Sequence, residues 1–386
     1  TRKIDDLYSF GLTIMATRAG FTDDGLTSRC TIMPTTSTDN PENYNLIPPY
    51  EWLEIGKMLQ RKMLLFRLRH MGGKMPTQLL LPGITSFRVR ESLLILQGLK
   101  DEDPTITNKI VDLAKKMQEQ TIIERAASPD GLVLNAVYNF LRDPTTVLEK
   151  WKCSFIPILT MATSKKKKRV TFVSSLALPD DIYLEEILQD GKPAFVVYDK
   201  KTDTWTIEPK IKVGKMTYKP IPVTKNLLKS LILPDGIEEY GTLTDLRKEM
   251  HDFALDEYDP VDSELLYLLI IDMLLTSWIS PDWQENMAEK FIPIINPRGG
   301  SETGKKRFLT VTRWLTYHSR YILKTDRIPS VYRCLMPWNA TLIMDEADLK
   351  DSKLDSEMTQ FLNSRCDGVG IPRYDTHTRK IDDLYS

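Results

Sequence analysis

Cysteine and histidine are both scarce in this sequence, with four of each among 386 residues. The cysteines lie far apart and form no CxxC pair, at Cys30, Cys153, Cys334 and Cys366. This spacing argues against a zinc cluster and a disulfide framework, and it suits a reducing, cytoplasmic setting. The histidines stand in unrelated contexts, at His70, His251, His318 and His377. No histidine, cysteine or serine constellation therefore indicates a metal centre or a nucleophilic active site.

The sequence also lacks an excess of charge of one sign and a long apolar run. It has 52 basic and 53 acidic residues, so any nucleic-acid-binding surface must be a local patch. The most apolar run, 265–279, is broken by Asp272 and falls short of the roughly 20 residues that span a bilayer. We interpret this run as a buried core helix. No segment near the beginning has the layout of a signal peptide, so we expect no membrane association.

One feature that is present concerns the order of the chain. The same nine residues, TRKIDDLYS, occupy positions 1–9 and 378–386. Their mixed chemistry argues against a low-complexity repeat, and a chance repeat of this length is very rare. The repeat indicates that the segments of this chain follow one another in an unusual order.

Hydrophobic patterns predict short elements near the start and a helical region after them. Residues 10–18 and 30–35 are typical of strands around a short helix, and 51–71 predicts an amphipathic helix with a basic flank. A later helix has an apolar face of Ile106, Ile110, Val111, Leu113, Ala114 and Met117. Residues 125–141 have the length of half a winged-helix unit, for which DNA binding and plain packing are both open.

At Met161, which has the look of a native start, the pattern changes to alternating apolar and polar residues. This alternation, with turn signals between the runs, predicts a small antiparallel β domain up to about residue 240. The basic run from Lys165 to Arg169 is either a solvated tail or a segment that contacts phosphates. Helices return from about Thr242.

The clearest chemical signal is a glycine-containing loop between an apolar run and a helical pattern. A phosphate-binding loop needs glycines that turn backbone N–H groups toward an anion, a helix N-terminus, and a lysine for the outer phosphates. The pattern GxxxxGK supplies all three, and the expected nucleotide-binding residues are Gly299, Gly300, Ser301, Glu302, Thr303, Gly304, Lys305 and Lys306. The usual motif ends in Ser or Thr, whose hydroxyl binds Mg²⁺, and Lys306 departs from it.

An acidic pair follows a second apolar strand further along the chain. Asp345 and Glu346 are placed so that the aspartate could hold Mg²⁺ and the glutamate could polarise an attacking water. An acidic pair after a strand is also typical of a helix cap. Its occurrence after the glycine loop, with a strand before each motif, favours a nucleotide site.

Together these motifs resemble the AAA+ kind of P-loop ATPase, whose core continues with a sensor strand, an arginine after a short helix, and a helical lid. Those parts occur at the other end of this chain. Residues 10–18 resemble the sensor strand, with Thr17 at the sensor position. The sequence GLTSRC places Arg29 as in clamp-loader ATPases, and Glu51 onward resembles the lid. The chain therefore looks like a circularly permuted AAA+-like ATPase, with a regular order from Met161 through Ser386 to Phe10.

The resemblance implies roles for individual residues. Lys305 would hold the β and γ phosphates of ATP, Asp345 would bind Mg²⁺, Glu346 would orient water, and Thr17 would sense the γ-phosphate. Arg29 would reach the nucleotide of a neighbouring subunit, since a planar, permanently charged guanidinium suits a transferring phosphoryl group. This implies a homo-oligomer, for example a hexameric ring. The plain alternative for Arg29 is a surface salt bridge.

We therefore expect an α/β fold with a P-loop core around a parallel sheet, a helical lid, a small β-rich domain and a helical module with winged-helix as one option. The expected domains are 1–95 (second half of the core and lid), 96–160 (helical module), 161–240 (β domain) and 241–386 (first half of the core). The expected function is ATP hydrolysis on DNA by a helicase, translocase or replication initiator, like ATPases of mobile elements. The alternative is a DNA-binding or protein-interaction module with a decayed or switch-like nucleotide site, as Lys306 would indicate. Protein remodelling is also open.

Overall fold

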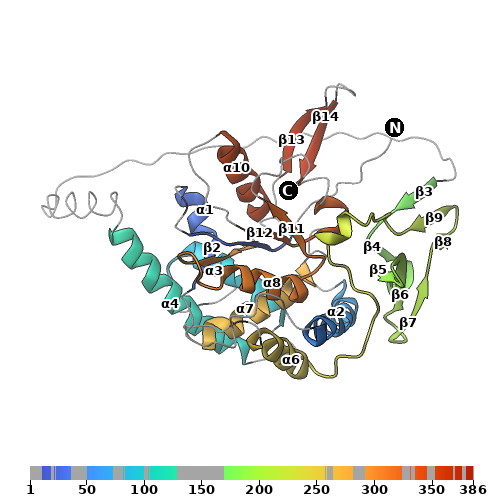
Figure 1. Ribbon diagram of the computed structural model, residues 1–386, viewed down its shortest axis with the longest axis horizontal. Helices are drawn as coiled ribbons and strands as arrows, with labels where there is room; N and C mark the ends of the chain where they lie inside the picture. The colour runs from blue at the N-terminus through green and yellow to red at the C-terminus, as the bar shows by residue number, and fades with distance from the viewer. Residues whose placement is uncertain are drawn as a thin grey trace, which may run out of the picture.

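A computed structural model of the chain is shown in Figure 1. It describes residues 11–18, 21, 23–35, 50–72, 81, 83–99, 103, 105–127, 169–256, 258, 264–280, 292–323, 331, 335–345, 353–367, 370–375 and 380–385. Glu346, the first copy of the repeat, most of the winged-helix candidate 125–141 and the lysines of the basic run lie outside these residues.

A parallel sheet of five strands forms the centre of the molecule. Its spatial order is β11 (Arg320–Leu323), β12 (Leu342–Asp345), β1 (Thr13–Met15), β10 (Ile294–Arg298) and β2 (Cys30–Pro34). The middle strand, β1, pairs in parallel with β10 on one side and with β12 on the other. The predicted α/β class with a parallel sheet is confirmed, and the strands come from both ends of the chain.

Helices cover both faces of this sheet (Figure 1). One face packs against α2 (Tyr50–His70), α6 (Leu243–Leu255), α7 (Glu264–Thr276) and α8 (Lys305–Leu315), and the other against α1 (Asp24–Ser28) and α10 (Lys353–Asp367). Alternate strand residues point to opposite faces. Accordingly, Ile295 and Ile343 join the first core cluster, whereas Ile294 and Met344 join the second.

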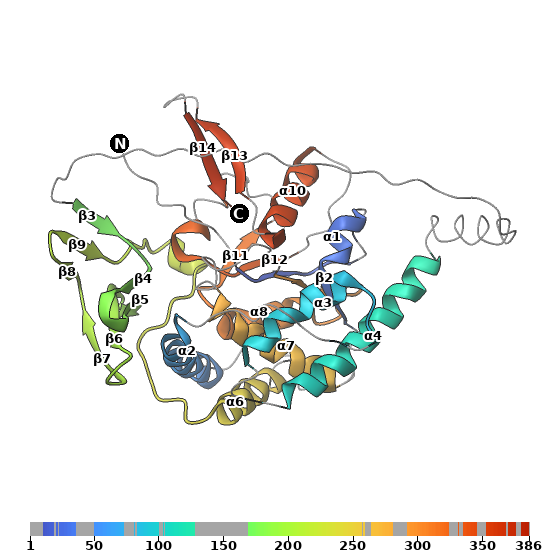
Figure 2. The same cartoon turned by 180° about the vertical axis from the view of Figure 1, so that it is seen from behind.

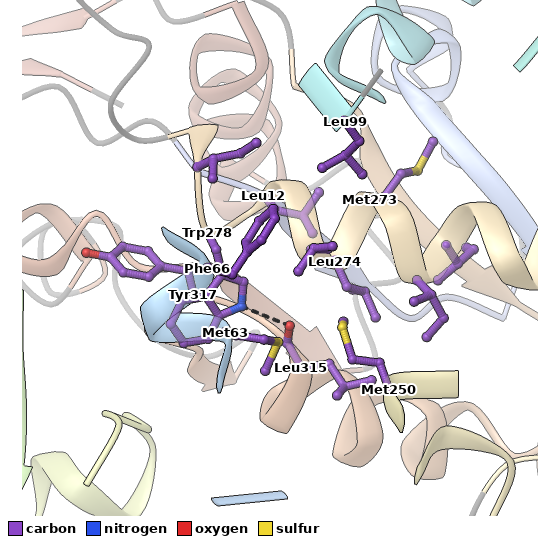
Figure 3. Close-up of a cluster of buried hydrophobic side chains, with 14 of the residues drawn as sticks. Leu12, Met63, Phe66, Leu99, Met250, Met273, Leu274, Trp278, Leu315 and Tyr317 are labelled. Atoms are coloured by element: carbon purple, nitrogen blue, oxygen red, sulfur yellow. Dashed lines mark hydrogen bonds between the residues drawn. The ribbon is translucent and has the colours of Figure 1, made fainter. Parts of the chain in front are cut away.

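The larger core lies between α2, α7 and α8 (Figure 3). The predicted core helix is α7, which is mostly apolar because it is buried, and Leu274 near its end and Trp278 just after it are at most 1% exposed. The indole Nε1 of Trp278 donates to the carbonyl of Leu315 at 3.1 Å. This bond fixes the end of α7 to the end of α8, the helix that follows the glycine loop.

A helical extension packs against α7. It consists of α3 (Phe87–Leu94), the 3₁₀ helix η2 (Ile95–Leu99) and α4 (Ile106–Ala127). The predicted apolar face of α4 is confirmed, since Ile106, Ile110, Leu113 and Ala114 are buried and Val111 and Met117 pack against the core.

The β-rich part contains two small sheets, seen beside the helices in Figure 2. One is an antiparallel sheet in the order β4 (Ser175–Leu178), β5 (Ile182–Gln189), β6 (Lys192–Asp199) and β7 (Thr204–Glu208). The other has the order β3 (Arg169–Phe172), β9 (Met216–Lys219) and β8 (Ile211–Val213).

The sequence-based prediction for this part was wrong in one respect and incomplete in another. The pairing of β3 with β9 is parallel, not antiparallel. These two strands lie at the two ends of the segment 169–219 and come together in one sheet. The alternating runs that predicted this part did not include residues 182–189, which form β5, because Glu185 and Glu186 interrupt their apolar pattern. Both glutamates are 0% exposed, so this strand is buried on both sides.

The remaining elements are short. A hairpin joins β13 (Gly370–Asp375) to β14 (Lys380–Tyr385), and β14 consists of residues from the second copy of the repeat. Short 3₁₀ helices occur at η3 (Pro179–Asp181), η4 (Leu227–Lys229) and η6 (Met336–Trp338). In the described part of the chain, every helix is too short or too polar to cross a bilayer.

A buried ion pair joins the β-rich part to the helices. The guanidinium of Arg67 on α2 donates from Nε to Oε2 of Glu185 on β5 at 2.9 Å, and both side chains are at most 1% exposed. Tyr317 also donates its hydroxyl to Glu185, and its ring centroid lies 4.4 Å from the Arg67 guanidinium. Burial lowers the pKa of the adjacent His318 to about 4, so this histidine is neutral and adds no charge at neutral pH.

Replacing Arg67 by methionine should destabilise the protein strongly. The change leaves the Glu185 carboxylate buried without its counter-charge, a situation that costs about 3–5 kcal/mol. Urea unfolding followed by tryptophan fluorescence measures the loss. The matched control is Lys248→Met, which breaks the exposed pair with Asp252 and should leave the midpoint nearly unchanged. Equal losses for the two variants would contradict the role given to the buried pair.

Candidate functional site

The predicted phosphate loop lies between a strand and a helix. Strand β10 ends at Arg298, residues 299–304 form the loop, and α8 begins at Lys305. Gly304 has φ 76°, a left-handed conformation that glycine adopts without strain, and it is the residue that caps α8. Its backbone conformation turns the chain into the helix, whose N-terminal amides are the kind of site that favours anions.

Gly299 is required by a close approach to the residue that follows β2. A Cβ at this position would lie 2.7 Å from Oγ1 of Thr303 and closer still to the carbonyl and hydroxyl oxygens of Thr35. Thr35 donates its amide to the carbonyl of Arg298 at 2.7 Å, and its hydroxyl lies 2.8 Å from that of Thr303. The loop is therefore held against the end of β2, and Thr35 is a site residue that the sequence analysis missed.

The two lysines at the start of α8 behave differently. Lys305 folds back over the loop, where its Nζ donates to the carbonyl of Gly299 at 2.6 Å and to that of Gly300. Lys306, which replaces the usual Ser or Thr, is exposed. The ammonium of Lys305 also donates to Oγ1 of Thr303 in the loop at 3.3 Å.

Thr17 follows β1 and is bonded to the loop through its backbone. Its carbonyl accepts from the amide of Gly299 at 3.2 Å, and its amide donates to the carbonyl of Pro297 at 3.1 Å. The side chain is 1% exposed, and its hydroxyl donates to Oδ1 of Asn296 at 3.0 Å. Thr17 therefore lies next to the loop, but its hydroxyl is used by a buried asparagine on β10.

Arg298, directly before the loop, is a second residue that sequence reasoning missed. Its Nε and Nη2 atoms are buried and have no hydrogen-bond partner within the described ranges. Arg298 is half-buried as a whole, but buried donors without a partner are costly, so these two nitrogen atoms favour a ligand that accepts hydrogen bonds, such as a phosphate. The available signal was an arginine and an asparagine, Asn296, at the end of an otherwise apolar strand.

Asp345 ends β12, on the other side of β1. Its Oδ2 accepts a hydrogen bond from the hydroxyl of Tyr321 on β11 at 3.1 Å, which orients the carboxylate. The strands β12 and β10 are separated only by β1, so Asp345 lies about 10 Å from the end of β10, two strand spacings away. The partner predicted for Asp345, Glu346, lies outside the described residues.

Arg29 lies at the opposite edge of the sheet. It follows α1, its Nη1 donates to the carbonyl of Gly25 at 2.9 Å, and its own carbonyl accepts from the amide of Ile294 at 3.0 Å. That bond places it at the amino end of β10, about 16 Å from Gly299 along the strand. The structure therefore does not bring Arg29 together with the other predicted site residues of its own chain.

The loop, Thr17 and Asp345 lie at the carboxyl edge of the sheet. At this point the chain continues from the adjacent strands β10 and β1 to opposite faces of the sheet. The loop after β10 leads to α8 on one face, whereas the segment after β1 leads to α1 on the other. In open α/β sheets, ligands bind in the crevice at such a switch point.

The residue types at this edge suit a phosphorylated ligand and a hard cation. Loop amides, Lys305 and Arg298 provide positive charge, and Asp345 provides one carboxylate. Within the described ranges no group of three or more His, Cys, Asp or Glu side chains could hold a metal alone. This composition fits Mg²⁺, which takes one or two protein carboxylates and completes its shell with phosphate oxygens and water.

Comparisons with known proteins do not assign the chain to a group. No protein-family model matches it, and no curated protein and no solved structure is significantly similar to it. The site must therefore be interpreted from its own geometry.

Replacing Gly299 by alanine should destabilise the protein, whereas the same change at the neighbouring Gly300 should not. The new Cβ at 299 would force the loop away from Thr35 at a cost of about 1–3 kcal/mol. At 300 the nearest atom, Cγ2 of Thr303, is 4.0 Å away. Thermal unfolding of both variants measures the difference. Equal melting temperatures would show that the loop does not pack against Thr35 in solution.

Proposed function

We propose that this chain is an AAA+-like P-loop ATPase that hydrolyses ATP and acts on DNA as a helicase, translocase or replication initiator. One observation carries the proposal. The GxxxxGK loop, Thr17 and Asp345 come from opposite ends of the chain, yet they lie at one edge of a parallel sheet beside its switch point. This is the arrangement that the resemblance implied for a permuted chain.

Binding of ATP would use the groups at the carboxyl edge. The loop amides and the N-terminus of α8 would hold the phosphates, and Lys305 would exchange its bonds to Gly299 and Gly300 for bonds to phosphate oxygens. Arg298 would supply further positive charge. Asp345, oriented by Tyr321, would hold Mg²⁺. When bound, Mg²⁺ neutralises charge that develops on the phosphate oxygens.

Arg29 would act across an interface and not within its own chain. Its position at the amino end of β10 puts it out of reach of the loop that follows the same strand. An arginine so placed can contribute to hydrolysis only in the site of another copy, so this role requires an oligomer. Oligomerisation and DNA as the substrate both come from the resemblance.

An alternative function is favoured by Lys306. This exposed lysine brings a cation to the position where a hydroxyl usually binds Mg²⁺. If no other hydroxyl replaces it, the protein would bind nucleotide as a switch, or not at all, and act on DNA or another protein without hydrolysis.

The purified protein should hydrolyse ATP in the presence of Mg²⁺, faster with single- or double-stranded DNA, and removal of Mg²⁺ with a chelator should abolish hydrolysis. Glu346→Gln should still bind ATP but lose at least about 100-fold in kcat, because the attacking water is no longer activated. Steady-state phosphate release and equilibrium binding of a fluorescent ATP analogue measure the two effects.

Lys305→Ala serves as the companion variant and should lose ATP binding as well as turnover. Unchanged turnover in Glu346→Gln would refute the assigned site. Nucleotide binding without any turnover in the unmodified protein would favour the switch-like alternative.

Arg29→Ala alone should lose about 1,000-fold in turnover, as expected for a residue that stabilises the transferring phosphoryl group. A mixture of Arg29→Ala with Glu346→Gln should regain activity, because a Glu346→Gln copy can offer its Arg29 to a neighbour with an intact Glu346. Steady-state hydrolysis across mixing ratios tests this. A mixture as inactive as its components would contradict action across an interface.

A further inference from the structure

The sheet formed by β3, β9 and β8 presents lysines beside exposed apolar side chains. In its register, Lys212 on β8 is opposite Thr217 on β9, which in turn pairs with Val170 on β3. Two residues further along, Lys219 pairs with Phe172. Residues that pair across strands point to the same face, so these five side chains form one surface, here called the lysine face.

The segment that contains β8 and β9 and supplies the lysines of this face is strongly basic, although the whole chain is nearly neutral. Residues 209–225 contain no acidic residue, and their lysines are Lys210, Lys212, Lys215, Lys219 and Lys225. In the described part of the chain, none of them forms an ion pair, unlike Lys201 of the preceding turn, which lies 3.8 Å from Asp180. The face therefore has uncompensated positive charge that suits a polyanion.

Apolar groups on the same face are unusually exposed. Phe172 is 52% exposed and Val170 is 55% exposed. Exposed apolar groups that gather at one place often mark an interaction site. A positively charged surface with an accessible aromatic ring is the combination that binds single strands, because bases stack on the ring while lysines contact the phosphates.

The lysine face also lies away from the helical layers. Figures 1 and 2 both show β3, β9 and β8 at the outer side of the β-rich part, far from α7 and α8. A long single-stranded nucleic acid could therefore lie across this sheet without contacting the glycine loop at the carboxyl edge of the main sheet.

We propose that the lysine face binds single-stranded nucleic acid, with a base stacked on Phe172 and phosphates held by Lys212, Lys219 and the exposed Lys210 directly before β8. The proposal rests on the proposed function for its biological use, since it supplies the surface that holds the strand on which the ATPase acts. The binding itself needs no ATP. A duplex fits less well, because its bases are already stacked on one another and cannot cover the phenylalanine ring.

The test measures binding of a fluorescently labelled oligothymidylate to the full chain without nucleotide, by anisotropy at several salt concentrations. Replacing Lys210, Lys212 and Lys219 together by alanine should raise Kd at least tenfold. The slope of log K against log salt should become shallower by about 2, since each lost phosphate contact removes about 0.7. Phe172→Ala should raise Kd about 5- to 100-fold with little change in the slope, because stacking is not ionic.

Two controls separate this surface from general charge and from unfolding. Replacing the exposed Lys115, Lys116 and Lys192 together by alanine removes as many charges elsewhere and should leave Kd unchanged. Phe172→Tyr keeps an aromatic ring and should restore most of the affinity. All variants should keep the melting temperature of the unmodified protein, because the altered side chains are exposed.

The outcomes distinguish this proposal from the ATPase proposal. Lys305→Ala should bind the oligonucleotide as well as the unmodified protein does, so a failed ATPase assignment leaves this result standing. A single-stranded RNA probe that binds through the same residues also supports the proposal. Equal losses in the two triple variants, or tighter binding of a duplex that is insensitive to Phe172→Ala, would overturn it.

Discussion

The rest of the structure depends on the pairing of β1 with β10 and β12. This strand comes from the beginning of the chain, and its two neighbours come from the last hundred residues. Its main-chain bonds place Thr17 against Gly299, and its width sets the distance between the glycine loop and Asp345. Without β1 in this position, nothing would join β10, which precedes the glycine loop, to β12, which ends at Asp345, and one edge of β12 would be unpaired. The unusual order of segments in the chain is therefore compatible with one continuous sheet.

A second constraint connects the β-rich part to the candidate site. Arg67 and Glu185 hold strand β5 against α2, and Tyr317, which joins them, lies just after α8. The helix α8 begins at the loop lysine, Lys305, and ends next to Tyr317. A displacement of the β-rich part would therefore act on the C-terminal end of α8. The lysine face belongs to that same part. Packed side chains and one buried charge pair thus connect the part of the fold that carries the lysine face with α8, the helix that follows the glycine loop.

Local sequence patterns predicted most elements near the site, because each depends on neighbours along the chain. The core helix α7, strand β12 before Asp345, and the strand, loop and helix around Gly299–Lys305 were all anticipated. The apolar runs that predicted this part left out strand β5 because its two buried glutamates hide the apolar pattern, and Glu185 is accommodated only by a partner from another element, Arg67. The parallel pairing of β3 with β9 was missed because alternation marks a strand without revealing its neighbour.

The sequence by itself determined the composition of the site: a loop with glycines where the backbone must turn, a lysine at the start of a helix, and an aspartate after an apolar strand. Tertiary structure alone decided what surrounds them. It placed Thr35 where only a glycine at 299 fits, left two buried nitrogen atoms of Arg298 without a partner in the described part of the chain, and put Arg29 at the far edge of the sheet. The physical reason is that periodicity and turn preference act over a few residues. Strand order, by contrast, is set by the burial of whole faces and joins residues almost three hundred positions apart.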